Sequence, residues 1–88
     1  MHLLLDLKDR ERIAELARRY LQPHQPRDYR LEVDVESIHQ DEDWYYVVVE
    51  PSREGVRSYD YSARLAEAEL DLQEKEKVNI LLVPALPN

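Results

Sequence analysis

One short run of this sequence carries no charge and is apolar on both of the faces that a strand would present. The run is Val78-Asn79-Ile80-Leu81-Leu82-Val83, and such a run is typical of a strand buried on both sides. The order of the elements predicted below puts this strand at a sheet edge, where natural proteins usually place charges or bulges. We therefore expect something to cover it, and a second copy of the chain is the simplest candidate.

The length and composition of the chain predict a single small domain over residues 1–88. A domain of this size buries only about 60–65% of its unfolded surface. The chain has no Cys, so no disulfide framework supports the core. We expect the domain to be stabilised by packing alone or by association.

The charge of the chain disfavours binding to nucleic acid. The formal net charge is −7, and the acids are concentrated in residues 31–88, which hold fourteen Asp or Glu against five Lys or Arg. Phosphate backbones are bound by dense basic faces. No run approaches the roughly 20 apolar residues of a membrane span, and no basic N-terminal region precedes an apolar stretch. We expect a cytoplasmic protein that binds neither nucleic acid nor membrane.

Two segments show the periodicity of amphipathic helices. Leu7 to Leu21 is the first, and about Tyr59 to Glu76 is the second. Their apolar residues recur at spacings of three and four. The predicted inward faces are Ile13, Leu16, Ala17, Tyr20 and Leu21 in the first helix, and Tyr61, Leu65, Ala68 and Leu72 in the second.

The segment between the helices predicts a pair of antiparallel strands. Tyr29 to Val35 alternates strictly between apolar and charged residues, which is typical of a half-buried strand. Ile38 breaks the parity and indicates a bulge or the end of the strand. His39 to Asp43 is polar and predicts a turn, and Trp44 to Glu50 is rich in aromatic and β-branched residues that favour a strand. The short connection predicts a hairpin.

These elements predict an α+β fold with two helices packed on one face of a small three- or four-stranded, mostly antiparallel sheet. The order is αββαβ if Leu3–Leu5 extends the first helix. It becomes βαββαβ, the ferredoxin-like arrangement, if residues 2–6 form a strand. The final strand is expected at a sheet edge in both versions.

The aromatic strand holds the candidate partner-binding residues, Trp44, Tyr46 and Val48. They share one face, and they would lie beside the charged side of the first strand if they face away from the helices. Aromatic anchors of this kind bind partner proteins. The alternative is an exposed sheet face made of good strand formers.

The candidate self-association residues lie on two other elements. Ile80 and Leu82 belong to the final strand. Leu70 belongs to a second apolar strip of the second helix, which also contains Ala63 and Ala66. Small residues would allow another helix to approach closely, although Ala is also a common surface residue of helices.

The start of the second helix is a further candidate for binding. Free amide groups at a helix N-terminus favour anions, and Arg53 and Arg57 lie nearby in the sequence. The alternative is structural, with Tyr61 packed inward and Tyr59 against the helix start.

Motifs for chemistry are absent from the sequence. The three His residues are scattered, and a single Gly excludes phosphate-binding loops and dinucleotide fingerprints. We expect no catalytic residues, no metal and no cofactor. The sequence predicts a non-enzymatic, homodimeric protein-protein interaction or regulatory module. A small-ligand-binding regulatory domain of ferredoxin-like type is the alternative, and a nucleic-acid-binding domain is a third that the acidic charge disfavours.

Overall fold

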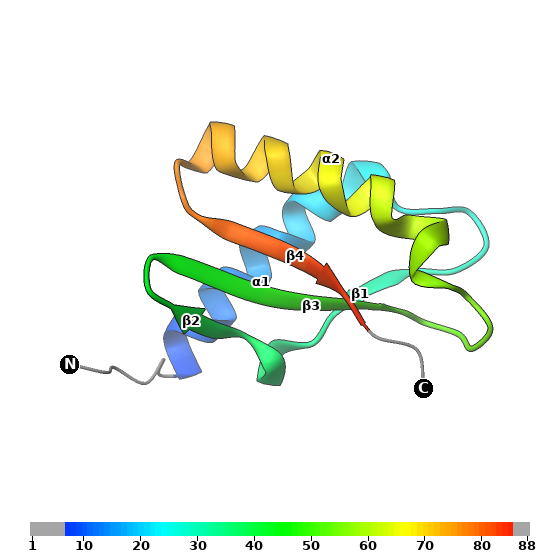
Figure 1. Ribbon diagram of the computed structural model, residues 1–88, viewed down its shortest axis with the longest axis horizontal. Helices are drawn as coiled ribbons and strands as arrows, with labels where there is room; N and C mark the ends of the chain where they lie inside the picture. The colour runs from blue at the N-terminus through cyan, green and yellow to red at the C-terminus, as the bar shows by residue number, and fades with distance from the viewer. Residues whose placement is uncertain (1–6, 86–88) are drawn as a thin grey trace.

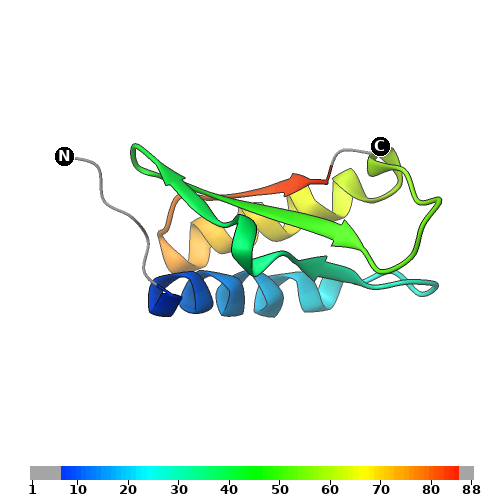
Figure 2. The ribbon, with the colours of Figure 1, turned by 90° about the horizontal axis from the view of Figure 1, so that it is seen from below.

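The computed structural model describes residues 7–85 of the chain and contains two helices on one side of a sheet (Figures 1 and 2). This confirms the predicted α+β class. Residues 2–6, which decide between the αββαβ and ferredoxin-like orders, lie outside the described residues. The elements are α1 (Leu7–Leu21), η1 (Gln22–His24), β1 (Leu31–Val33), η2 (Val35–Ser37), β2 (His39–Asp41), β3 (Trp44–Pro51), α2 (Ser58–Glu76) and β4 (Ile80–Pro84), where η denotes a 3-10 turn.

Both helices form where the apolar periodicity predicts them. The stripe of α2 is fully buried, and α1 buries Ile13, Ala17 and Leu21 together with Ala14. Pro23 follows α1 and prevents its continuation. The helix α2 ends at Glu76, and the next residue, Lys77, adopts the left-handed conformation with a φ of 57°. Glycine usually occupies that position because it carries no Cβ.

The strand β3 is the centre of the sheet, because its alternate residues bond to opposite neighbours. The carbonyl of Val48 accepts a hydrogen bond from the N–H of Asp34, while the carbonyl of Val49 accepts one from the N–H of Ala85. The strands β1 and β2 pair with β3 in the antiparallel sense, and β4 pairs with it in the parallel sense. The sheet is therefore mixed, with two antiparallel pairs and one parallel pair.

The edge strand beside β3 is longer than the sequence predicts, and it is broken in the middle. The residues predicted as a turn, His39 to Asp43, include the strand β2, so that part of the prediction is wrong. The chain leaves the sheet at η2 and returns to it at His39, and the turn is confined to Glu42 and Asp43. Glu42 has a φ of 57°, the left-handed conformation that two-residue hairpins require. All three residues of β2 are polar and exposed, so no hydrophobic pattern indicated a strand.

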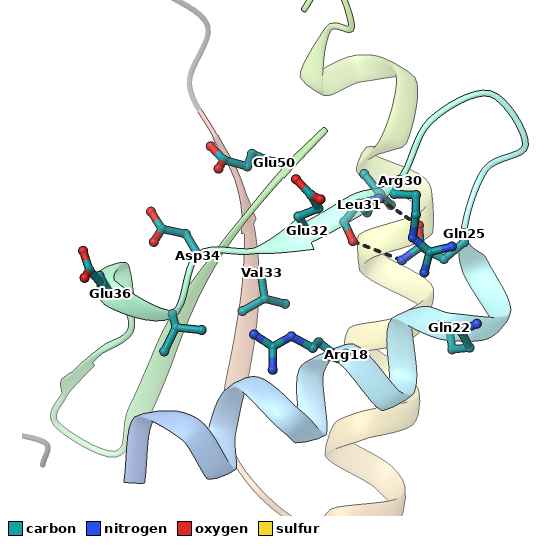
Figure 3. A pocket seen from close by; sticks show the side chains of 11 residues that line it. Arg18, Gln22, Gln25, Arg30, Leu31, Glu32, Val33, Asp34, Glu36 and Glu50 are labelled. Carbon is teal, nitrogen blue, oxygen red and sulfur yellow. Dashed lines mark hydrogen bonds between the residues drawn. The ribbon is translucent and has the colours of Figure 1, made fainter. Parts of the chain in front are cut away.

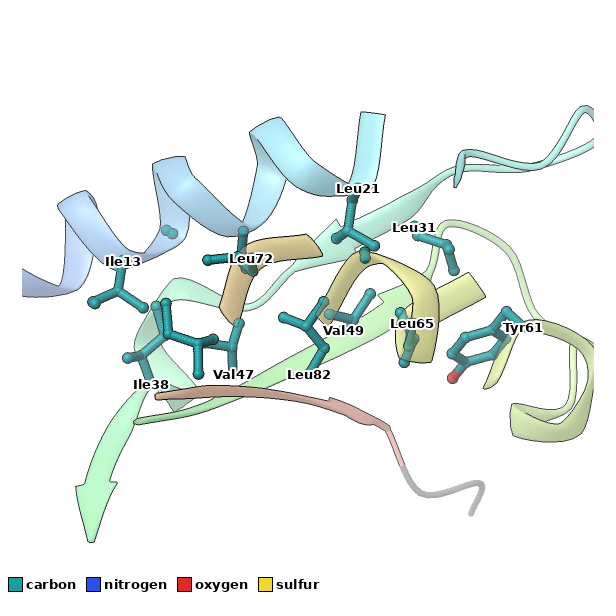
Figure 4. Packing of buried hydrophobic residues seen from close by; sticks show 14 residues of the cluster. Ile13, Leu21, Leu31, Ile38, Val47, Val49, Tyr61, Leu65, Leu72 and Leu82 are labelled. Carbon is teal, nitrogen blue, oxygen red and sulfur yellow. The ribbon is translucent and has the colours of Figure 1, made fainter. Parts of the chain in front are cut away.

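The core lies between the inner face of the sheet and the two helices (Figure 4). The strands contribute Leu31, Val47, Val49, Ile80 and Leu82, all of them buried. Tyr61 is the largest fully buried side chain. No polar or charged residue of the described part of the chain is classed as buried, so packing of apolar side chains holds this core together.

Side chains occupy the outer edge of β4. Its pairing with β3 leaves the backbone groups of Ile80 and Leu82 pointing away from the sheet. Glu69 Oε1 accepts a hydrogen bond of 2.9 Å from the N–H of Leu82, and Gln73 Nε2 donates one of 3.1 Å to the carbonyl of Ile80. Pro84 has no N–H to offer. Strand β4 is thus an edge strand, as predicted, but two side chains of α2 cover part of its edge.

The outer edge of β1 is covered in a similar way. The amide of Gln25 accepts a 2.8 Å hydrogen bond from the N–H of Leu31 and donates a 3.0 Å bond to the carbonyl of the same residue. One side chain thereby imitates the backbone of a neighbouring strand. Because β1 and β2 have only three residues each, neither edge of the sheet offers a long row of free backbone groups.

Candidate interaction surface

The side chains of β3 divide between the two faces of the sheet. Val47 and Val49 are fully buried beneath the helices, and Tyr45 packs against the same core. The alternate residues Trp44, Tyr46 and Val48 are half-buried and lie on the opposite face. The structure therefore places the three candidate partner-binding residues together, on the face that neither helix covers.

Strand β4 extends this apolar surface. In the parallel pairing, Leu81 lies beside Tyr46 and Val83 beside Val48. Both β4 residues are half-buried, and neither belongs to the core cluster. The prediction that this strand is buried on both sides is therefore wrong for the single chain. We call these five residues the open-face patch: Trp44, Tyr46, Val48, Leu81 and Val83.

His39 fixes the position of one aromatic ring in the open-face patch. It is the cross-strand neighbour of Tyr46, and the two rings stack with centroids 5.0 Å apart and planes inclined by 9°. The His39 Nδ1 lies 3.1 Å from the carbonyl of Ser37. A ring held in place loses little conformational entropy when a partner packs against it.

Carboxylates surround the patch. Glu32 and Glu50 lie directly opposite each other on β1 and β3, and both are exposed. Figure 3 shows their side chains, with those of Asp34 and Glu36, on the side of β1 away from α1. Asp41 lies opposite Trp44 at the other end of β3. Within residues 7–85, the four strands contain no Lys or Arg, so the sheet surface is apolar along β3 and acidic at both of its ends.

The structure separates the three candidate self-association residues. Ile80 and Leu82 face the helices and are almost completely buried, with 0% and 6% of their surface exposed. Leu70 is 58% exposed on α2, and Ala63 and Ala66 are also exposed. Self-association through any of these residues stays a prediction. Side-chain contact with a partner is open only to Leu70 in the folded chain.

Two hollows open on the surface beside the acidic rim of the patch, and Glu50 contributes to both. One of about 500 Å³ follows β1 and is lined by Arg18, Gln25 and the acids of Figure 3. The other, of about 480 Å³, lies at the start of α2 and includes Arg53, Arg57 and Tyr61. In the second hollow the guanidinium carbon of Arg53 lies 5.7 Å from the centre of the Tyr29 ring, and the N–H of Arg57 donates to the Asp60 carboxylate.

Polar links between the helices lie on the far side of the molecule from the patch. The Tyr20 hydroxyl donates a 2.7 Å hydrogen bond to Glu76, and this bond raises the pKa of Tyr20 above its ordinary value. His24 lies within ion-pair distance of Glu67 and Asp71, at 3.8 and 3.6 Å. Burial raises the pKa of Tyr61, although the backbone of Ala85 partly opposes the shift. The contacts of Tyr20 and His24 join α1 and the turn that follows it to α2.

Within residues 7–85, no group of three or more His, Asp or Glu is placed to hold a metal ion. No helix of the same residues is sufficiently long and apolar to cross a bilayer.

The chain was compared with known proteins in three ways. No family model matches it, and neither the search of curated proteins nor that of solved structures found a match.

Sequence reasoning found only part of this surface. Trp44, Tyr46 and Val48 share a parity that is visible in the sequence, and the alternation in β1 placed Glu32 on the same face. Leu81 and Val83 were missed as patch residues because β4 is apolar on both faces, so its pattern does not indicate which face the helices cover. His39 was missed because it was assigned to a turn.

Proposed function

We propose that this chain is a non-enzymatic interaction module that binds another protein through the open-face patch. The observation that carries the proposal is the half-buried apolar surface formed by Trp44, Tyr46, Val48, Leu81 and Val83, which no helix of the described residues covers. A contiguous apolar surface with a polar rim is typical of protein interaction sites. The presence of Trp and Tyr at its centre fits the residue types that dominate binding energy.

The same surface supports association with a different protein better than association with a second copy. A homodimer that packed the two open faces together would bring Glu32 and Glu50 of one copy to a face that is itself acidic. Like charges at an interface oppose association. The homodimer expected from the sequence remains an alternative, and the experiment below distinguishes the two.

Photo-crosslinking tests the proposal. The residue p-benzoylphenylalanine is placed at Val48 in the patch, or at Ala66 on the exposed side of α2 as a control, and the cells that express the protein are irradiated. We expect adducts from position 48 that are lost when Tyr46→Asp is added, and no such adducts from position 66. An adduct with a second copy would identify a homodimer. Equal yields from both positions, or none from position 48, would contradict the proposal.

A small-ligand regulatory domain is the second candidate, and the hollow at the start of α2 is the observation that favours it. The hollow lies where the parallel strands β3 and β4 end and where α2 begins, the position at which α/β units commonly bind ligands. Arg53 and Arg57 would favour an anionic metabolite. A thermal-shift screen of anionic metabolites, repeated with Arg57→Gln, tests it: stabilisation that the variant loses supports this function, and no stabilisation contradicts it.

A further inference from the structure

The charges and edges of the sheet together specify what kind of segment fits the open-face patch. Building on the proposed function, we infer that the partner supplies a cationic amphipathic helix, with an apolar stripe against the patch and Lys or Arg near both of its ends.

The edges of the sheet argue for a helix rather than a strand. An added strand binds through free backbone groups at an edge. On β4, Glu69 and Gln73 already occupy the N–H of Leu82 and the carbonyl of Ile80. On β1, Gln25 occupies both backbone groups of Leu31. The remaining edge segment, β2, has only three residues. We therefore expect recognition to use side chains on the face of the sheet, where helices pack, as α1 and α2 do on the other side.

The carboxylates argue for a cationic partner. Glu32 and Glu50 are direct cross-strand neighbours, an arrangement of like charges that is unfavourable. Among the described residues, neither Glu32 nor Glu50 makes a salt bridge. A Lys or Arg from a partner would relieve this repulsion. Asp41, beside Trp44, offers a second carboxylate at the opposite end of β3.

The length of β3 fixes the spacing of the basic residues. Trp44 and Glu50 are separated by about 20 Å, because a strand rises by about 3.3 Å per residue. A helix rises by about 1.5 Å per residue, so the two basic positions lie roughly 13 residues apart in a helix aligned with β3. The stripe between them contacts Tyr46 and Val48 with their β4 neighbours Leu81 and Val83.

A display library tests the inference. The library presents helical peptides with a fixed apolar stripe and randomised residues at and beyond both ends, and it is selected on the folded domain at about physiological salt. We expect enrichment of Lys and Arg at both ends. Enrichment of neutral or acidic residues at the ends would overturn the inference.

The best peptide is then titrated by the fluorescence of Trp44, which is the only Trp of the chain and lies in the patch. Replacing two exposed carboxylates by Glu32→Gln and Glu50→Gln is expected to weaken binding by about 3- to 10-fold, the effect of two pairs at an interface rim. The matched pair Glu11→Gln and Glu74→Gln, which removes the same charge from exposed helix positions, is expected to change nothing. Equal weakening by both pairs would overturn the inference.

The two proposals fail in different ways. If the library selects no helical binder while p-benzoylphenylalanine at position 48 still captures a protein, the chemistry inferred for the partner is wrong and the surface stands. If position 48 captures nothing, the proposed function itself is wrong. An adduct with a second copy would assign the patch to a homodimer and overturn the cationic helix.

Discussion

The Oε1 atom of Glu69 accepts a 2.9 Å hydrogen bond from the backbone N–H of Leu82, so a helix side chain occupies the place of a neighbouring strand. Gln73 does the same for the carbonyl of Ile80. The most apolar strand of the chain thus lies at a sheet edge whose backbone is partly closed from within the same molecule. Natural sheets use several devices to prevent pairing of edge strands. Here two side chains of α2, Glu69 and Gln73, occupy the backbone groups of the edge.

Removal of these two side chains should open the edge of β4. We expect the double substitution Glu69→Ala and Gln73→Ala to increase concentration-dependent association, because free N–H and C=O groups then accept another strand. Light scattering over a concentration series measures the effect. The double substitution Glu74→Ala and Lys75→Ala, at exposed positions of the same helix, is the control. Scattering no greater than that of the control would show that the hydrogen bonds of α2 do not protect the edge.

Neighbouring leucines of β4 should respond very differently to truncation. Leu82 is 6% exposed and belongs to the core, so Leu82→Ala is expected to lower the free energy of unfolding by about 2–5 kcal/mol. Leu81 is half-buried on the open face, and Leu81→Ala is expected to cost about 1 kcal/mol. Urea unfolding measures both. Equal costs for the two substitutions would mean that something already covers the open face in solution.

The link between Tyr20 and Glu76 should make the protein sensitive to alkaline pH. Because the pKa of Tyr20 is raised in the folded state, its contribution to stability is complete below the unfolded pKa of about 10. That contribution is lost as the pH rises through the folded pKa. The raised pKa of Tyr61 acts in the same direction. We expect Tyr20→Phe to be less stable than the wild type near neutral pH and to lose less stability above about pH 10. Melting temperatures measured across this range check it, and parallel pH profiles for both proteins would contradict it.

Two left-handed residues mark positions where glycine should stabilise the fold. Lys77 at the end of α2 and Glu42 in the β2–β3 turn each have a φ of 57°, which is costly for a residue with a Cβ. We expect Lys77→Gly and Glu42→Gly each to raise the free energy of unfolding by about 0.5–1 kcal/mol. Ala66→Gly, on the exposed side of α2, should instead lower it by about 1 kcal/mol. Chemical unfolding measures all three, and a loss of stability at Lys77 or Glu42 would disprove the interpretation for that residue.

The helices and the central strand were predictable because one local pattern specifies each of them. The bounds of α1 agree with the periodicity of Leu7 to Leu21, and the buried stripe of α2 contains the residues that the spacing predicts. The aromatic and β-branched run of β3 extends by one residue only, to Pro51. The alternation in β1 correctly placed Glu32 on the face away from the helices.

The remaining features depend on contacts between segments that are distant in the sequence. Strand β2 has no apolar residue, and it exists because it pairs with β3. The hydrogen bond from Leu82 to Glu69 joins residues that no pattern relates. For the candidate surface, parity placed Trp44, Tyr46 and Val48 on one face, but the position of Leu81 beside Tyr46 depends on the parallel register.

The parallel pairing of β3 with β4 has a consequence for the order in which the chain can fold during synthesis. All the other described elements leave the ribosome before β4, which places Ile80 beside Tyr45 and Leu82 beside Val47. Until then, one side of β3 has no neighbouring strand, and the buried residues of α2 lack the part of the core that Ile80 and Leu82 supply. The nascent domain should remain open to proteases and chaperones until its last described strand arrives, and then close in a single step.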